Sequence, residues 1–135
     1  MKVEFSVPGC PIPQGSIRAF MPKGWTRPVL TSDNPKLKVW RATVNVAAQS
    51  AMRVQCQDRA EKGVPLNITM AFYFRKPTSV KADSKTTKPD VDKLVRSIFD
   101  SLTGVVYTDD SQVVIVTAAK HFGTPERVEI FAESL

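Results

Sequence analysis

The sequence is poor in residues that bind soft metal ions. It has one histidine, His121, and two cysteines, Cys10 and Cys56, which do not form a CxxC pair. We therefore expect no zinc site, and we expect both cysteines to be reduced, small apolar residues of an intracellular protein. A metal ion in this protein would have to bind oxygen ligands, which suit Mg²⁺, Mn²⁺ or Ca²⁺.

Long hydrophobic runs are also missing. No stretch of about 18 apolar residues occurs, so we expect no membrane-spanning helix. Met1–Val7 alternates between apolar and polar residues and is too short for a signal peptide. With 135 residues, 42% of them hydrophobic and 24% charged, the chain is expected to form one globular domain over residues 1–135, and we expect it to be cytoplasmic.

Acidic residues are fewer than basic ones. The 19 lysines and arginines outnumber the 13 aspartates and glutamates, which gives a formal net charge of +6. This surplus favours a polyanionic partner, most simply nucleic acid. Gln14–Pro35 mixes basic residues with glycine and proline and predicts a long loop or an irregular strand pair. Arg75–Pro89 predicts a solvated basic loop.

Periodicity predicts the other elements, because alternating apolar residues indicate strands and apolar residues three or four apart indicate helices. The predicted strands are Lys2–Val7, Asn67–Phe74, Val113–Ala119 and Arg127–Ala132, the last two joined as a hairpin through Gly123 and Pro125. The predicted helices are Pro35–Gln57 and Asp92–Leu102, with Gly104 as a C-terminal cap. This order predicts an α+β fold, a small mixed or antiparallel sheet with two helices on one face.

Two aromatic residues lie in the first basic stretch. Phe20 and Trp25 are interspersed with Arg18, Lys23 and Arg27. This mixture is typical of a surface that grips a nucleic-acid backbone and stacks on bases. Alternatively, the two rings pin the loop to the hydrophobic core.

The aspartates are concentrated in one short segment. Five of them fall within 21 positions, namely Asp90, Asp92, Asp100, Asp109 and Asp110. Neighbouring carboxylates repel unless a proton or a cation joins them, and a hard divalent cation is the simplest agent. The segment therefore predicts a metal site, with Mg²⁺ as the expected ion and Mn²⁺ as a substitute.

Local conformation predicts how the first two aspartates lie. Pro89 restricts Lys88 to extended conformations, and Asp92 is predicted to cap a helix that begins at Lys93. Residues two apart on an extended segment point the same way. Asp90 and Asp92 are therefore expected to face one metal ion.

The remaining residues of the segment follow a helix and a turn. Asp92, Arg96 and Asp100 are spaced by four and predict one helix face, so Arg96 would lie beside the metal and contact the scissile phosphate. Asp109 and Asp110 are expected to fold back from the next turn and complete the site. The alternative is that these residues are only a helix cap, surface ion pairs and a turn.

Three motifs in this region resemble a known family. The segments Lys88–Leu94 (KPDVDKL) and Phe99–Val113 (FDSLTGVVYTDDSQV) are similar to the KPDxDN segment, FDAL-like helix and YxDDxQI-like turn of the RusA family of Holliday-junction resolvases. The spacing between the motifs is also kept. Gly9–Arg27 resembles the family more loosely.

The resemblance implies a homodimeric α+β endodeoxyribonuclease, often encoded by phages and prophages, that makes paired nicks across four-way DNA junctions with Mg²⁺. It places the essential aspartates on Asp90, Asp92 and Asp110 and the basic helix residue on Arg96, with Asp100 of less certain role. Asp100 and Asp109 are possible further ligands or supporting groups. The expected contacts to the DNA backbone come from Lys76, Lys81, Lys85, Lys88, Lys93, Arg18 and Arg27.

Two departures and three alternatives accompany the resemblance. Lys93 replaces the family's usual asparagine, and Arg96 replaces a lysine, so a proton cannot come from Arg96 at neutral pH. The chain could instead be a non-catalytic module that binds branched DNA, or a nuclease for flaps, D-loops or RNA. In a third reading the aspartates have only structural roles.

Overall fold

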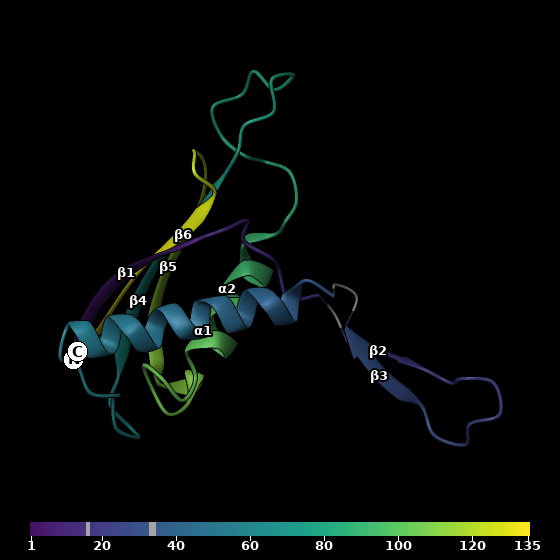
Figure 1. Ribbon diagram of the computed structural model, residues 1–135, viewed down its shortest axis with the longest axis horizontal. Helices are drawn as coiled ribbons and strands as arrows, with labels where there is room; N and C mark the ends of the chain where they lie inside the picture. Colours follow the sequence, from purple (N-terminus) through teal and green to yellow (C-terminus); the bar gives the residue numbers. More distant parts are fainter. Residues whose placement is uncertain (16, 33–34) are drawn as a thin grey trace.

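The structure is a computed structural model that describes residues 1–15, 17–32 and 35–135 (Figure 1); within 17–32 it describes the side chains of residues 21–28. The elements follow the order β1 (Lys2–Pro8), β2 (Ile17–Phe20), β3 (Val29–Ser32), α1 (Leu37–Val54), β4 (Leu66–Phe74), α2 (Val91–Leu102), η1 (Asp110–Gln112), β5 (Val113–Phe122) and β6 (Arg127–Ser134). Over these residues, no helix combines the length and the apolar character needed to cross a bilayer.

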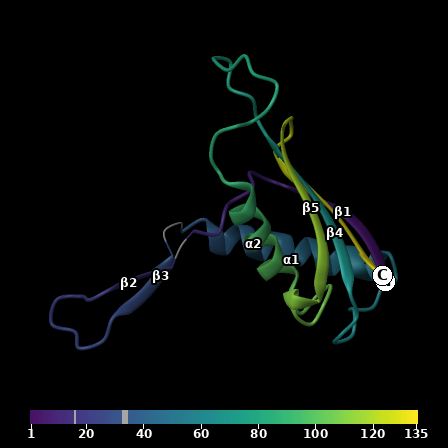
Figure 2. The same ribbon diagram turned by 180° about the vertical axis from the view of Figure 1, so that it is seen from behind.

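Four strands form a mixed sheet in the order β1-β6-β4-β5. β6 is antiparallel to both β1 and β4, whereas β4 and β5 are parallel. Both helices pack on one face of the sheet (Figures 1 and 2). The predicted α+β fold with a mixed sheet and two helices is therefore confirmed.

The hydrophobic core lies between this face and the helices. Strand β4 shows why, since its alternate residues Ile68, Met70, Phe72 and Phe74 are all buried, as predicted. Residues of the same strands that point to the other face are mostly polar. One face of the sheet thus supports the helices, and the other is open to solvent.

The predicted hairpin between the last two strands is wrong. Strand β4 lies between β5 and β6, so these two strands do not pair. The segment β4–α2–β5 is a crossover unit, and a crossover helix brings two strands together in parallel. The turn after β5 therefore crosses the end of β4, where Gly123 donates its backbone N–H to the Phe74 carbonyl at 2.9 Å.

Helix α1 is shorter than predicted, and its buried stripe contains only part of the predicted one. It spans Leu37–Val54 rather than Pro35–Gln57. Spacings of three and four along this segment predict an inward stripe of Val39, Trp40, Val44, Ala47, Ala51 and Val54. Trp40, Val44 and Ala51 are buried, and Ala47 is partly buried against the core. Val39 and Val54 were also expected to pack inward, but their exposed fractions are 69% and 72%. The true buried stripe uses Leu37, Ala48 and Met52 instead.

Residues 17–32 form an arm outside this body. Strands β2 and β3 pair antiparallel and extend away from the sheet and helices (Figures 1 and 2). This confirms an irregular strand pair rather than a plain loop. Trp25 is 61% exposed, so it does not pin the arm to the core. The side chains of Arg18 and Phe20 lie outside the described part of the chain.

Candidate active site

The first two aspartates of the cluster lie at the N-terminus of α2. The helix begins at Val91, two residues before the expected start at Lys93, with Asp90 rather than Asp92 as its N-cap. Asp90 has extended backbone, and Asp92 lies in the first helical turn. The prediction that Asp90 and Asp92 lie together on one extended segment is therefore wrong, because Asp92 is already helical. An acidic residue in this turn is favourable, since the helix N-terminus carries partial positive charge.

The carboxylates of these two residues are not used by the fold. Asp90 is a good N-cap residue, yet its side chain makes no capping hydrogen bond. Its one described contact is a loose ion pair with Lys93 at 3.5 Å. Asp92 makes no hydrogen bond or ion pair with the described part of the chain. Both side chains are exposed and available to a ligand.

Arg96 follows one turn after Asp92 on the exposed side of α2. Like Asp92, it has no hydrogen bond or ion pair within the described residues. The alternative in which Asp92, Arg96 and Asp100 are surface ion pairs is thus not borne out. Asp100 lies instead 3.9 Å from Arg41 of α1, with both side chains partly exposed. A pair of this kind contributes little to stability.

A groove runs beside Asp90. It has a volume of about 460 Å³ and is lined by Cys10, Pro11, Pro13, Gly15, Phe74, Lys88, Pro89, Asp90 and Lys93. One wall is the segment that leads from β1 to the arm, and the other is the start of α2. The Gln14 N–H donates to the Lys93 carbonyl at 3.0 Å and ties the two walls together.

Cys10 and Cys56 are both free and exposed, so the expectation that they pack as small apolar residues is wrong.

Lys120 was not anticipated from the sequence. Its Nζ donates to the backbone carbonyls of Thr87 at 2.8 Å and Pro89 at 3.0 Å. These carbonyls belong to the segment immediately before Asp90, so Lys120 on β5 holds the entry to α2. A lysine near the end of an alternating strand gives no local signal of this role, because its partners lie more than 30 positions away.

The last two aspartates lie in the turn after α2. Asp109 caps the short helix η1, accepting a hydrogen bond from the Ser111 N–H at 2.8 Å. The buried Gln112 completes the cap, since its Oε1 accepts from the N–H groups of Asp109 and Thr108. Its Nε2 donates to the carbonyls of Glu61 and Val64. Asp110 is thus held on a rigid turn.

The surroundings of Asp109 and Asp110 shift the pKa values of these two carboxyl groups in opposite directions. The backbone hydrogen bond from Ser111 lowers the pKa of Asp109. Partial burial, followed by the negative charges of Asp109 and Asp100, raises the pKa of Asp110. Carboxyl groups with a shifted pKa are common at functional sites.

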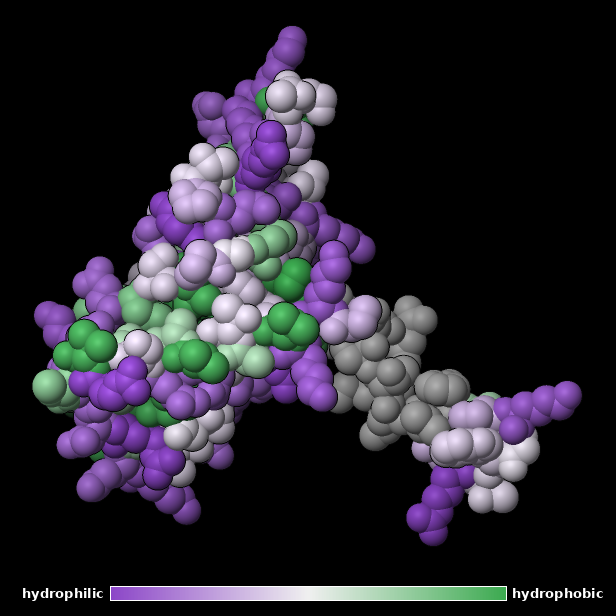
Figure 3. Space-filling model, in the orientation of Figure 1, coloured by the Kyte–Doolittle hydropathy of each residue, from purple (hydrophilic) through white to green (hydrophobic). Residues whose placement is uncertain are grey.

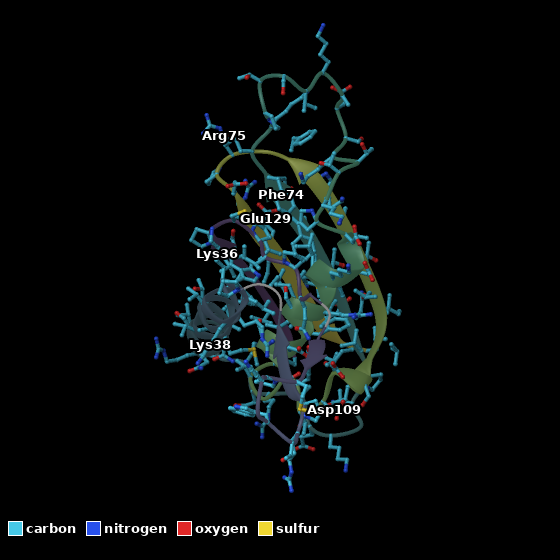
Figure 4. The ribbon with its side chains drawn as sticks, turned by 90° about the vertical axis from the view of Figure 1, so that its right-hand side faces the viewer. Lys36, Lys38, Phe74, Arg75, Asp109 and Glu129 are labelled. Atoms are coloured by element: carbon cyan, nitrogen blue, oxygen red, sulfur yellow. The ribbon has the colours of Figure 1, made fainter. Side chains whose placement is uncertain are left out.

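The structure does not bring Asp110 to Asp90 and Asp92. The buried Tyr107 donates its hydroxyl to the Phe99 carbonyl at 2.8 Å, which anchors the turn at the C-terminal end of α2. A helix of 12 residues is about 18 Å long. In Figure 4, Phe74, which lines the groove with Asp90, lies well above Asp109.

The candidate metal ligands suit a hard cation, because all of them are carboxylate oxygens. Within residues 1–15, 17–32 and 35–135, however, no three side chains of histidine, cysteine, aspartate or glutamate form a metal-binding group. Asp90 and Asp92 are the carboxylates best placed to hold an ion beside the groove. The expectation that the turn folds back onto them is not met in this chain.

Comparison with known protein families gives a match over residues 8–133 to the family described as Endodeoxyribonuclease RusA. The chain belongs to the RusA family. A relative named "Uncharacterized protein YqaN", from Bacillus subtilis (strain 168), is 31% identical over 142 aligned residues, which cover 95% of this chain and 93% of that protein. "Crossover junction endodeoxyribonuclease rusA" from Lactococcus phage r1t is 32% identical over 93 residues, covering 67% of this chain and 71% of that protein.

Of the basic residues expected to contact DNA, Lys88 and Lys93 line the groove of this RusA-family chain. Lys81, Lys88 and Arg27 are exposed. Lys76 lies over the Phe122 ring, and Lys85 lies over the Phe74 ring at 5.0 Å from its centroid. These rings hold the two ammonium groups near the ends of β4 and β5. The loop is therefore partly anchored rather than only solvated.

Proposed function

We propose that this RusA-family chain is a Mg²⁺-dependent endonuclease that resolves four-way DNA junctions by paired nicks. The observation that carries the proposal is the start of α2, where Asp90, Asp92 and Arg96 share an exposed site with no structural use for Asp92 or Arg96. The phage relative bears the name crossover junction endodeoxyribonuclease. Structural roles alone do not account for these side chains.

The proposed site divides its work among a few residues. Asp90 and Asp92 would hold Mg²⁺ at the start of α2. The third carboxylate that the family resemblance implies, Asp110, lies with Asp100 and Asp109 toward the other end of this helix, so within one chain these three do not reach the same ion. Bound Mg²⁺ would polarise the scissile phosphate and lower the pKa of a coordinated water. Arg96 binds a non-bridging phosphate oxygen and stabilises the added charge, with Lys93 as the nearby alternative cation.

The charge distribution supports DNA binding on the groove side. Glu4 and Glu129 line a cavity of about 440 Å³ on the open face of the sheet, and Glu133 lies on the same face. Lys2 and Arg127 lie on this face too, and Arg127 pairs with Glu129 at 3.0 Å, so this face offers a phosphate no surplus of positive charge. In the loop between β4 and α2, Lys88 lines the groove that contains Asp90, and Lys85 lies over Phe74, another residue of this groove. DNA bound there would meet positive charge first and the aspartates second.

The homodimer is part of the same proposal, because two-fold symmetry places two sites on opposing strands of a junction. The outer face of α1 suits a second copy of this chain. Val39, Val46 and Val54 are all more than 60% exposed, and hydrophobic residues gather over α1 (Figure 3). Val39 and Val54 lie seven and eight positions from Val46, so antiparallel α1 helices crossing at Val46 would match valine with valine.

The test is nicking of a labelled synthetic four-way junction with and without Mg²⁺. Wild type is expected to make symmetric nicks only with the metal. Asp92→Asn should lower the nicking rate at least about 100-fold, because it removes a ligand charge. Asp58→Asn, at an exposed aspartate away from the site, is the matched control and should nick like wild type.

Other outcomes would redirect the proposal. Tight junction binding without nicks in either Mg²⁺ or Mn²⁺ would leave a non-catalytic binding module. Faster cleavage of flaps, D-loops or RNA than of junctions would make it a related nuclease. Unchanged activity of Asp92→Asn would return the aspartates to a purely structural role.

A further inference from the structure

We propose that Trp25, at the tip of the β2–β3 arm, stacks on unpaired or unstacked bases where DNA branches. The inference rests on the proposed action on branched DNA and names the residue that distinguishes a branch point from plain duplex. Continuous duplex offers no free base face, whereas a branch point can. Trp25 would therefore determine structural specificity rather than catalyse the reaction.

The first support is the exposure of the ring. Trp25 is 61% exposed, whereas Trp40 is 4% exposed and packs in the core. A large aromatic side chain in solvent at a protruding tip has no stabilising role in the described fold. The tip stands clear of the body in the space-filling view (Figure 3). The ring is thus available to a partner.

The second support is the built turn that presents the ring. The Trp25 N–H donates to the Pro22 carbonyl at 3.0 Å. Gly24, at the third position of this turn, has a φ of 82°, as a type II turn requires. No heavy atom lies within 4 Å of a Cβ placed there, so glycine is required by the backbone angle and not by crowding. Trp25 is the fourth residue of this turn, so the turn fixes the position of its backbone.

The third support is charge. No aspartate or glutamate occurs between Phe5 and Ser32. Lys23 and Arg27 flank Trp25, and both are exposed. A ring between cations on an arm without carboxylates matches a polyanion with flat bases. A second copy of this chain is the less suitable occupant, because it also carries a positive net charge.

The fourth support is the position of the arm relative to the site. The segment that leads from β1 to the arm forms one wall of the groove that contains Asp90. Gln14 binds this wall to Lys93 at the start of α2. A DNA strand held at Asp90 therefore lies beside the root of the arm, and the tip can engage another part of the same junction.

Tryptophan fluorescence tests the inference without any need for cleavage. The exposed, acrylamide-accessible emission belongs to Trp25, and Trp25→Phe identifies it by its loss. In EDTA, a saturating four-way junction should quench this emission at least twofold, and a linear duplex of the same sequence should quench it far less. Single-stranded oligo-dT, whose bases are already unstacked, should also quench it.

Binding by anisotropy of labelled DNA gives the second readout. Trp25→Ala should weaken junction binding about tenfold, which corresponds to about 1.4 kcal/mol, and leave duplex binding unchanged. Trp25→Phe should retain most of the affinity, because it keeps an aromatic face. Met21→Ala removes another exposed apolar side chain of the arm and is the matched control, expected to bind like wild type.

The outcomes separate this inference from the proposed function. Quenching by the junction in a protein that never nicks would uphold the arm and overturn the nuclease. If wild type binds no junction, quenching of the Trp25 emission by oligo-dT becomes the deciding measurement. Trp25 emission that is unchanged by oligo-dT would then overturn the inference. Equal losses for junction and duplex in Trp25→Ala would also overturn it, as would quenching that depends on protein concentration without DNA.

Discussion

At the level of single residues, the surroundings of Asp110 oppose the negative charge of its carboxylate. Its folded-state pKa is raised by partial burial and by the charges of Asp109 and Asp100. The folded protein therefore holds this proton more tightly than the unfolded chain does. The protonated carboxyl of Asp110 therefore adds to the free energy of unfolding at any pH below the ordinary pKa of aspartate. This contribution is lost as the pH rises through the higher pKa of the folded state. At neutral pH the ionised group destabilises the fold.

Asp110→Asn should consequently be more stable than wild type at pH 7 in EDTA. The gain is expected to stay below about 1 kcal/mol, since the group is near solvent. It should vanish at pH 3, where the wild-type carboxyl is protonated. Thermal unfolding at both pH values measures this.

Asp109→Asn is the companion variant with the opposite sign. Its pKa is lowered by the Ser111 N–H, so removal of the charge should reduce stability at pH 7. A gain for both variants at pH 7 would contradict the assignment of the two carboxylates.

At the level of elements, the start of α2 depends on a strand far away in the sequence. Lys120 of β5 binds the carbonyls of Thr87 and Pro89 and so fixes the segment before Asp90. These are charge-assisted hydrogen bonds at a partly exposed position, each stronger than a neutral one. Lys120 is therefore a positioning residue rather than a catalytic one.

Lys120→Met keeps the length of the side chain and removes both bonds. We expect the nicking rate to fall about tenfold at saturating junction while junction affinity changes little, together with a loss of about 1 kcal/mol of stability. The matched control is Lys88→Met, at an exposed lysine in the same region. Its expected effect is the reverse, weaker DNA binding with an unchanged rate at saturation. Equal effects of the two variants on binding and on rate would argue against positioning.

At the level of the whole molecule, α1 and the two sheet edges limit how copies can associate. Gln55 and Gln57 bind backbone groups of β1 and cover that edge, which discourages edge-to-edge pairing. The outer edge of β5 has no partner strand in the described sheet and exposes Val114, Ile115 and Val116. The valine face of α1 is the surface proposed for the dimer.

Val46→Glu should convert a dimer into a monomer in sedimentation equilibrium, because two-fold symmetry brings the two copies of residue 46 together. The same change should replace paired nicks with single, uncoupled ones. Ile115→Glu on β5 is the control and should leave the dimer intact. Dissociation by Ile115→Glu alone would move the interface to the β5 edge.

Much of the architecture follows from local patterns. The alternation in β4 and the spacing of Leu94, Ile98 and Leu102 in α2 predict both elements, because these periods report directly which side of an element is buried. The outer valines of α1 were misassigned for a related reason. Apolar residues alone do not show whether a helix has one buried face or a second face for another copy.

The sequence by itself determined most of the elements and the family motifs, since each depends on residue types at short spacing. It also predicts that any metal ion would bind oxygen ligands, because histidine and cysteine are scarce. Only the tertiary structure decided that β4 separates β5 from β6, that Lys120 supports Asp90, and that Asp110 stays at the far end of α2. The reason is physical: these features depend on hydrogen bonds and packing between segments tens of residues apart, and short-range periodicity carries no record of them.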